Sequence, residues 1–268
     1  MSKTKNNDNS SNTSFISEIA SIGLVLIFAF FIRTFCFEIF YVPTGSMKNT
    51  ILEGDYIFST KYSYGYSIYS IPFHPDIFDA RIFANQPQRG DVVIMRPPHQ
   101  MDERYIKRLF GLPGDKIEII NDLIYINDIP IERVEIGNDI DENGVIFTKF
   151  QETLPNGVSY FSYKIHDLLD QIGLDRSNFG PYTVEPDRYF FIGDNRDNSG
   201  DSRYQLGTVP FRNFIAKARS VIFSTKITLW ESNESFWGQI KRVGSWITSV
   251  RFDRFFNKLY ETNQIEKT

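Results

Sequence analysis

The chain has 268 residues and a mass of 31.2 kDa, long enough for one large or two small domains with a buried core. Its 29 lysines and arginines against 33 aspartates and glutamates leave no basic excess for a nucleic-acid surface, so we expect no nucleic-acid partner. A single cysteine, Cys36, excludes an intramolecular disulfide and a multi-cysteine zinc site, and three histidines leave little room for a histidine-rich metal centre. We expect no metal and no cofactor, and nucleophilic catalysis here would need a base other than histidine.

The N-terminal region combines a polar tail with an apolar segment. Residues 1–14 are polar and low in complexity, which predicts a disordered tail. The 14 residues from Ile19 to Ile32 carry no charge and would span about 21 Å as a helix, at ~1.5 Å per residue. Continuing to Phe37 gives about 28 Å, near the ~30 Å of a hydrocarbon core, with Arg33 placed to snorkel towards the interface. We therefore expect residues 15–37 to form a single transmembrane anchor.

Two alternatives to an anchor remain open. A cleaved signal peptide needs a small-x-small cleavage site, and the sequence RTFCFEIFYVP contains none. A buried helix of a soluble protein is usually apolar on one face, whereas this segment is apolar all round. The pattern favours an uncleaved anchor. Its orientation is weakly indicated, because Lys3 and Lys5 before the segment barely outnumber Arg33 after it.

After the anchor, short β-branched and aromatic runs alternate with turn residues. The run 116–128 predicts a hairpin that turns at Asn121 and Asp122, and strands and helices show no sustained alternation. This pattern predicts a mainly antiparallel β fold. A Tyr-rich stretch, 61–75, is expected to be an irregular or extended edge segment, and 167–174 to form one or two helical turns. The other predicted strands lie at 89–98, 144–150, 158–165, 188–195 and 214–224.

The C-terminal tail, residues 231–268, changes character again. Apolar residues recur there at helical spacing between basic ones, which predicts an amphipathic helix. Such a helix would lie on a membrane surface or pack against the β domain, and the sequence does not separate the two. The apolar positions are Phe236, Trp237, Ile240, Val243, Ile247 and Val250.

Two segments contain residues that are able to carry nucleophilic chemistry. Ser46 lies in a Thr-Gly-Ser turn after Pro43, where the glycine lets the backbone approach a ligand closely. Strand alternation places Lys107 and Arg108 on opposite faces, neither of which is cleanly polar, so at least one of them should be buried. Taken alone, a serine in a glycine turn is common. Lys107 and Arg108 could also be surface residues whose charged ends extend into water or pair with carboxylates.

A third segment, GDNRDNSGDSR at 193–203, follows an apolar strand and is rich in charge. Asn195, Asp197, Ser199 and Gly200 resemble the start of a calcium-binding EF-hand loop. The twelfth position would be Leu206 instead of glutamate, and no flanking helix is predicted, which excludes that loop. A salt-bridged loop without a ligand remains a fair alternative.

The order of these segments is far more specific than any one of them. A membrane anchor followed by PTGSM, RGDVVIM, YIKRLFGLPGD and GDNRDNSGDSR resembles bacterial type I signal peptidase (leader peptidase). The resemblance implies that Ser46 is the nucleophile, that Lys107 is the general base and that Ser199 orients the lysine. It also implies ion pairs that support the site, formed by Asp194, Arg196, Asp201 and Arg203.

The resemblance further implies a domain arrangement and an oxyanion hole. Residues 38–117 and 186–230 would form a β catalytic core, and 118–185 an inserted β subdomain. The Ser46 N–H and the Thr44 hydroxyl would bind the oxyanion; the family often has serine at the latter position, and threonine keeps the hydroxyl but restricts its rotamer. The second span and the disulfide of the better-known Gram-negative members do not transfer, because this chain has one candidate span and one cysteine.

Elementary acid–base chemistry agrees with a lysine base. A serine hydroxyl is a weak nucleophile that needs an adjacent base. Free lysine has a pKa of ~10.4, and burial lowers it by up to ~3–5 units, enough to leave the amine neutral at pH 7. An arginine stays protonated, so Arg108 could not replace Lys107. The apolar neighbours that would bury the amine are Tyr105, Ile106, Leu109 and Phe110.

Taken with the patterns of the sequence itself, the resemblance implies that the chain is a membrane-anchored serine endopeptidase that removes signal peptides from exported preproteins, single-pass, with its catalytic domain on the periplasmic side of the cytoplasmic membrane. The expected partners are preproteins and the lipid bilayer. The resemblance implies shallow pockets that select Ala-x-Ala, walled near Phe40, Val42 and Met95, and a substrate bound as an added β-strand. Two alternatives stay open: a related Ser/Lys peptidase dedicated to a pilin or conjugation protein, and a non-catalytic membrane-tethered β protein.

Overall fold

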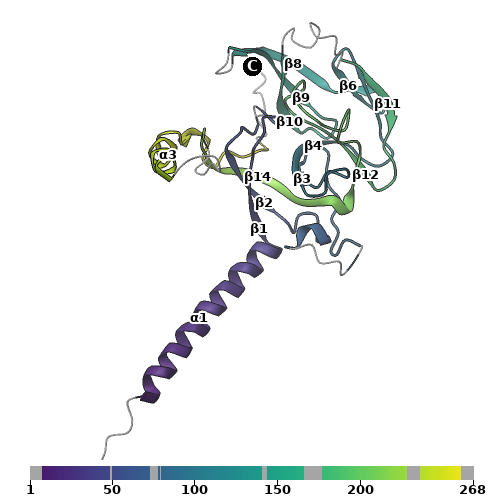
Figure 1. The fold of residues 1–268 in the computed structure, drawn as a ribbon. Coiled ribbons are helices and arrows are strands. Elements are labelled where there is room, and N and C mark those ends of the chain that lie inside the picture. The colour runs from purple at the N-terminus through teal and green to yellow at the C-terminus, as the bar shows by residue number, and fades with distance from the viewer. Residues whose placement is uncertain are drawn as a thin grey trace, which may run out of the picture.

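The computed structural model describes residues 8–48, 50–72, 78, 80–140, 144–165, 177–227 and 236–260. A long helix, α1 (Asp8–Phe35), extends from a domain built of three antiparallel sheets, and a second helix, α3 (Phe236–Thr248), lies to one side of that domain (Figure 1). This architecture confirms the predicted fold class. The predicted helical turns at 167–174 lie outside the described residues. The described part of 61–75 is irregular, with one short 3₁₀ helix, Ile68–Ser70.

The largest sheet contains both the first and the last strand of the chain. It has seven strands in the order β1-β2-β14-β3-β4-β12-β13, and β1 is an edge strand because it pairs with β2 alone. Every pairing in it is antiparallel. Its strands are β1 (Phe37–Tyr41), β2 (Asp55–Thr60), β3 (Val92–Met95), β4 (Tyr105–Gly111), β12 (Arg188–Ile192), β13 (Val209–Pro210) and β14 (Phe214–Ser224).

The chain between β4 and β12 forms the two smaller sheets. The predicted hairpin is confirmed: Ile120 pairs with Leu123, and Asn121 and Asp122 turn the chain with φ of 50° and 66°. Both residue types tolerate positive φ, which the two-residue hairpin turn requires. One sheet contains β5 (Lys116–Ile120), β6 (Leu123–Ile126), β7 (Ile129–Pro130) and β11 (Phe179–Thr183). The other contains β8 (Glu132–Ile140), β9 (Ile146–Thr153) and β10 (Ser159–Ile165).

The insertion shares a hydrophobic core with the largest sheet. One buried cluster joins Phe110 and Phe190 of that sheet to Ile117 and Leu154 of the insertion. Gly111, at the end of β4, lies where a Cβ would come within 2.9 Å of Val184 Cγ2 and 3.1 Å of Ile117 Cγ1, so the two parts approach closely there. The insertion is therefore packed onto the sheet that carries Lys107, and the subdomain bounds 118–185 stay a prediction.

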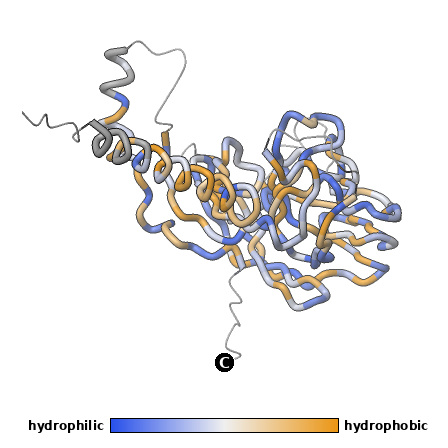
Figure 2. Tube along the Cα trace, turned by 90° about the horizontal axis from the view of Figure 1, so that it is seen from below, coloured by the Kyte–Doolittle hydropathy of each residue, from blue (hydrophilic) through white to orange (hydrophobic). Residues whose placement is uncertain are grey.

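Helix α1 exposes apolar side chains along its length. Its segment Ser17–Phe35 has 19 residues, and only 6% of its most apolar window is buried. Among the described residues it is the only helix long and apolar enough to cross a membrane. The tube of this helix is mostly hydrophobic in Figure 2, whereas the β domain alternates in character. Burial by protein does not explain such a helix.

The helix begins earlier than the sequence indicated. It starts at Asp8, so residues 8–14, which we expected in a disordered tail, are helical, and residues 1–7 lie outside the described chain. Extending an existing helix costs little once its nucleus has formed, and the long apolar segment supplies that nucleus.

The chain after α3 returns to the largest sheet. Val250 pairs with Thr225, and Lys258 pairs with Ser220 of β14. Leu259 is 5% exposed and belongs to the main core cluster. The Val92 N–H donates to the Tyr260 hydroxyl at 2.8 Å. We call residues 249–260 the C-terminal strap; the predicted amphipathic helix is therefore followed by a segment that packs on the β domain.

Candidate active site

Ser46 lies in the loop that follows edge strand β1. A turn begins there, in which the Lys48 N–H donates to the Gly45 carbonyl at 2.9 Å. Met47 and Ile51 are 1% and 0% exposed and belong to the main core cluster. These two side chains anchor the loop, while Ser46 keeps part of its surface free.

Strand β4 brings Lys107 to this serine. Its Nζ lies 2.5 Å from Ser46 Oγ, although the two residues are 61 positions apart in the chain. The same Nζ donates to the Ile106 carbonyl at 3.2 Å. Lys107 is opposite Val93 of β3 and is 4% exposed. The structure thus brings together the two residues that the sequence paired as base and nucleophile.

The environment of Lys107 lowers the pKa of its amine. Burial lowers the pKa of Lys107 from 10.5 to about 8, because removal from water penalises the charged form. The carboxylates of Asp201 and Asp194 act in the opposite direction and stabilise the ammonium. With a pKa of about 8, roughly a tenth of the amines are neutral at pH 7 and half at pH 8.

A groove of about 630 Å³ contains Ser46 and Lys107 in its lining. Phe40 and Val42, two of the predicted pocket walls, also line it. The third prediction, Met95, is wrong: Met95 is fully buried in a different hydrophobic cluster, and its neighbour Ile94 lines the groove. Successive residues of a strand point to opposite faces, so a one-residue error places a side chain on the other side of the sheet.

Arg108 points away from the groove and forms a buried ion pair. Its Nε lies 2.8 Å from Asp194 Oδ1 and its Nη2 lies 2.7 Å from Asp194 Oδ2, with both side chains 0% exposed. The Thr50 hydroxyl donates to Asp194 Oδ2 at 2.6 Å. Burial of at least one of Lys107 and Arg108 was predicted, and both are buried. A planar guanidinium matches two carboxylate oxygens, so Arg108 compensates the Asp194 charge.

Asp201 and Arg203 form a second compensated pair. Arg203 Nη2 lies 2.8 Å from Asp201 Oδ2, and Arg203 Nε lies 2.9 Å from Oδ1. The Gly193 N–H also donates to Asp201 at 3.0 Å. Burial would raise the pKa of Asp201, but the Arg203 guanidinium outweighs it and lowers the pKa overall. Asp201 therefore stays ionised beside Arg203.

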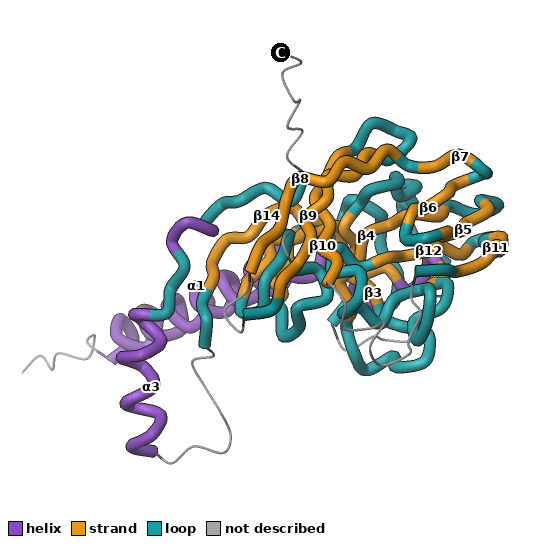
Figure 3. Tube along the Cα trace, turned by 90° about the horizontal axis from the view of Figure 1, so that it is seen from above, coloured by secondary structure: helices purple, strands orange, loops and turns teal. Residues whose placement is uncertain are grey.

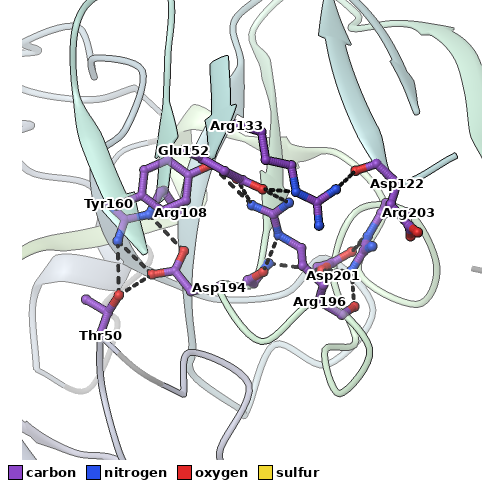
Figure 4. Close-up of polar contacts among 11 residues, drawn as sticks. Thr50, Arg108, Asp122, Arg133, Glu152, Tyr160, Asp194, Arg196, Asp201 and Arg203 are labelled. Carbon is purple, nitrogen blue, oxygen red and sulfur yellow. Dashed lines mark hydrogen bonds and ion pairs between the residues drawn. The ribbon is translucent and has the colours of Figure 1, made fainter. Parts of the chain in front are cut away.

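Arg196 reaches from the 193–203 loop into the insertion. Its Nη1 lies 2.9 Å from Glu152 Oε1 of β9, and its Nη2 contacts the other carboxylate oxygen (Figure 4). The Tyr160 hydroxyl of β10 donates to the same carboxylate. Burial alone would raise the pKa of Glu152, but the charge of Arg196 lowers it overall. This buried network ties the insertion to the loop behind the site.

The other two predicted site residues, Ser199 and Thr44, lie close by and make no hydrogen bond to Ser46 or Lys107 in the described part of the chain. Ser199 is 4% exposed. Its Oγ makes no hydrogen bond of good geometry among the described residues, but the hydroxyl lies near enough to Asp201 to help lower the pKa of that carboxyl. It packs against Gly193, where a Cβ would lie 2.2 Å from Ser199 Oγ. Thr44 is exposed and lines the groove. The lysine-orienting role of Ser199 and the oxyanion role of Thr44 stay predictions.

Sequence reasoning missed two residues behind the site. Glu152 lies 44 positions before its partner Arg196 and belongs to β9, whereas Arg196 lies in a loop, so no local pattern marks the pair. Asn195 has no predicted role beyond its place in the charged 193–203 segment, yet its Nδ2 donates to the Gly45 carbonyl at 2.9 Å. Only knowledge of which strands are neighbours, which a single sequence does not carry, would have identified either contact.

Comparisons with known proteins agree with the motifs. The family model described as "Signal peptidase, peptidase S26" matches residues 15–223. Signal peptidase I of Rickettsia typhi and that of Rickettsia prowazekii are each 54% identical over 263 residues, covering 97% of this chain and 100% of theirs. A crystal structure of a signal peptidase I from Enterococcus faecalis aligns with 24% identity and a TM-score of 0.30, covering 50% of this chain and 97% of that one. The resemblance drawn from the sequence is thereby confirmed, and the chain belongs to the signal peptidase family, peptidase S26.

Proposed function

We propose that this chain is a membrane-anchored serine endopeptidase that removes signal peptides from exported preproteins, with Ser46 as the nucleophile and Lys107 as the general base. The observation that carries the proposal is the 2.5 Å separation of Lys107 Nζ and Ser46 Oγ in the lining of an open groove. The relatives named above support the substrate class, since each is called signal peptidase I.

Acylation follows from this contact. Ser46 Oγ attacks the carbonyl carbon of the scissile bond as its proton passes to the Lys107 amine, which becomes an ammonium. The carbonyl oxygen becomes an oxyanion, and the Ser46 N–H and the Thr44 hydroxyl bind it. Collapse of this intermediate breaks the C–N bond, and the Lys107 ammonium returns its proton to the departing amine of the mature protein.

Deacylation uses the same base. A water molecule replaces the departed amine, and Lys107 accepts its proton while the water oxygen attacks the ester carbon. The C–O bond to Ser46 then breaks, the proton returns to Ser46 Oγ and the signal peptide leaves with a free carboxylate. One amine therefore serves both half-reactions, provided that it is neutral at the start of each.

The two ion pairs keep Lys107 available for this role. Asp201 and Asp194 are the carboxylates whose charge favours the lysine ammonium. Each is bonded at two points by an arginine, Arg203 and Arg108 respectively. These arginines offset the carboxylate charges, so burial remains the dominant influence on the amine.

Edge strand β1 would bind the preprotein as an additional strand. Its free edge offers main-chain groups for hydrogen bonds with an extended peptide. Because Ser46 follows β1 closely, a peptide aligned on this edge would deliver its scissile bond to the nucleophile. Shallow pockets near Phe40 and Val42 would admit small side chains at positions −3 and −1, which gives the Ala-x-Ala preference.

Helix α1 would cross the cytoplasmic membrane once and place the catalytic domain on the periplasmic side. Strand β1 begins at Phe37, two positions after α1 ends at Phe35, so the domain would sit close to the bilayer surface. Signal peptides are themselves inserted in that bilayer. Confining enzyme and substrate to one membrane raises their effective concentration without tighter contacts.

Helix α3 would be a second lipid contact. It lies beside the start of the β domain and runs crosswise to α1 (Figures 1 and 3), the orientation of an interfacial helix when α1 spans the bilayer. Val243 and Ile247, one turn apart, are 45% and 59% exposed. Phe252 and Phe256 after the helix are 72% and 74% exposed. Interfacial helices bury such apolar side chains at the boundary between headgroups and acyl chains.

The catalytic proposal is tested by cleavage of a preprotein that carries an Ala-x-Ala site. Ser46→Ala, Lys107→Ala and Lys107→Arg should each abolish cleavage, the last because a guanidinium stays protonated. Lys116→Ala, at a partly exposed lysine of β5, should keep the full rate. Chelators and thiol reagents should have no effect.

Retained cleavage in Lys107→Ala would remove the lysine as base. Cleavage restricted to one dedicated substrate would favour the narrower processing peptidase, and a wild-type chain that cleaves no preprotein would be a tethered β protein.

The membrane proposals have their own tests. Alkaline carbonate should not release the full chain from membranes, and its release would contradict an integral anchor. All three tryptophans lie within residues 230–246, so tryptophan emission reports on this stretch of the chain. Lipids with brominated chains should quench it. The double variant Val243→Asp and Ile247→Asp should reduce this quenching, whereas Ser245→Asp, on the opposite side of the helix, should not; equal effects would contradict the assigned face.

A further inference from the structure

One residue behind Ser46, Asn195, binds two successive carbonyl groups of the nucleophile loop. Its Nδ2 donates to the Gly45 carbonyl at 2.9 Å, and its main-chain N–H donates to the Ser46 carbonyl at 3.2 Å. The Gly45 carbonyl accepts a second hydrogen bond, from the Lys48 N–H, at 2.9 Å. The orientation of the peptide that joins Gly45 to Ser46 is therefore fixed from the side of Asn195.

That orientation determines where the Ser46 N–H points. A trans peptide is planar and directs its C=O and N–H to opposite sides. Because the Gly45 carbonyl faces Asn195, the N–H of the same peptide faces away from it. No described residue accepts a hydrogen bond from this N–H, and Ser46 lines the groove. An unused donor is thus left on the side where an oxyanion would form.

Asn195 is itself fixed on both sides. Arg108 binds Asp194, which precedes it, and Glu152 binds Arg196, which follows it (Figure 4). Gly193 lets the 193–203 loop lie close to the nucleophile loop, because a Cβ at position 193 would lie 2.5 Å from the Ser46 carbonyl oxygen. The buried network of Figure 4 therefore fixes the segment that orients the nucleophile loop.

The other end of the Asn195 amide is unused. The residue is 2% exposed, and its Oδ1 is buried without a hydrogen-bond partner among the described residues. The amide is assigned by its bond to Gly45, since the flipped amide would place oxygen against oxygen. A buried acceptor without a partner destabilises a fold, so packing alone does not account for asparagine at this position.

We propose that Asn195 is a positioning residue that sets the plane of the Gly45–Ser46 peptide, so that the Ser46 N–H faces the groove as an oxyanion donor. The inference rests on the proposed role of Ser46 as nucleophile. Without the Nδ2 donor, the peptide is free to turn its N–H out of the groove. That change weakens binding of the tetrahedral intermediate and leaves binding of the intact substrate unaltered.

The test compares Asn195→Leu and Asn195→Ala in the full chain. Leucine keeps the shape of the side chain, removes the donor and removes the unpartnered oxygen. Asn213 offers a matched control, because it is also 2% exposed and its Nδ2 donates to the Arg96 carbonyl at 2.9 Å, outside the groove lining. The measured quantities are kcat and KM for a preprotein, the affinity for a peptide aldehyde ending in Ala-x-alaninal, and the thermal unfolding midpoint.

Both Asn195 variants should lose kcat by about tenfold to hundredfold, with KM within about twofold of wild type, because only the transition state is affected. Affinity for the aldehyde, whose Ser46 adduct carries the oxyanion, should fall in parallel. The pH at which the rate is half-maximal should not move. Asn195→Leu should unfold at or above the wild-type midpoint, whereas Asn213→Leu should change stability and leave the ratio of aldehyde to substrate affinity unaltered.

A folded Asn195→Leu with wild-type kcat would overturn the inference, as would a rise in KM at constant kcat or unchanged aldehyde affinity. Failure of Asn195→Leu to fold, where Asn213→Leu folds, would contradict the claim that packing does not need the amide. These outcomes are separate from failure of the proposed function, which would appear as retained cleavage in Ser46→Ala.

Discussion

Arg108 and Asp194 form a two-point ion pair in which both side chains are completely shielded from water. Arg108 follows Lys107 in β4, and Asp194 precedes Asn195 in the loop behind Ser46. The pair therefore joins the strand that carries the proposed base to the loop that carries the carbonyl-binding asparagine. Removing one member leaves the other as an uncompensated buried charge, which costs roughly 3–5 kcal/mol.

Asp194→Asn should accordingly lower the free energy of unfolding by roughly 3–5 kcal/mol. Arg108→Lys should be milder, since lysine keeps the charge and loses the two-point geometry. Chemical denaturation of the full chain in detergent measures both. Asp128→Asn, which removes an exposed pair with Lys116, is the matched control and should have little effect. An Asp194→Asn variant as stable as this control would refute the importance of the buried pair.

Glu152 should control stability in acid. Its pKa is lowered from 4.5 in the folded state, so its stabilising contribution is fully present above that pH and is lost as the pH falls through the lower folded-state value. Glu152→Gln should be destabilised near neutral pH and should lose less stability than wild type on acidification. Unfolding midpoints between pH 7 and pH 3 measure this. Parallel curves for the two proteins would exclude Glu152 as the responsible group.

Lys107 should destabilise the fold near neutral pH, in contrast to Glu152, because its amine is buried. The pKa falls from 10.5 to about 8 on folding, so the unfolded chain binds the proton more tightly and wild-type stability should rise with pH between about 8 and 10.5. At pH 7 the lowered pKa of Lys107 reduces the free energy of unfolding by roughly 3 kcal/mol, at 1.36 kcal/mol per pKa unit. Lys107→Met should therefore be inactive but more stable at pH 7 and should lose this rise. A Lys107→Met variant less stable than wild type would contradict the cost assigned to burial.

The C-terminal strap should contribute strongly to the stability of the β domain. Leu259 is buried in the same cluster as Phe40 and Met47, and Arg254 pairs with the fully buried Asp55 at 2.6 Å. Truncation after Thr248 should lower stability by several kcal/mol, since one fully buried apolar side chain alone contributes ~1.5–3 kcal/mol and Asp55 would lose its partner. Truncation after Tyr260 is the control and should leave the unfolding midpoint unchanged. Equal midpoints for the two truncations would show that the strap is dispensable.

Local patterns in the sequence predict much of this fold. The Asn121–Asp122 turn is recognisable because few residue types accept positive φ. Helix α1 is recognisable because it contains a stretch of 19 residues that is long and apolar enough to span a membrane. The burial of Lys107 and Arg108 follows from strand alternation in an apolar segment. Each of these features depends on residues within a few positions of one another.

Features that depend on contacts between distant segments were not predictable in this way. The partner of Arg196 is decided by which strand of the insertion packs behind the 193–203 loop. The burial of Leu259 holds the strap against the β domain. The helical pattern of the tail is the same whether the strap packs on β14 or stays away from the domain with α3, so the sequence does not decide between them. The error at Met95 has a local origin, since the register of a strand decides which of two neighbouring apolar residues faces the groove.

The central claim is that a buried, neutral Lys107 activates Ser46. The measurement that tests it most directly is the pH dependence of the Ser46 acylation rate in a single turnover, with a preprotein in excess over its KM. The rate should rise with pH and level off with an inflection near pH 8, because the pKa of Lys107 is lowered to about 8. An inflection near 10.5, or a rate that does not change with pH, would contradict the account.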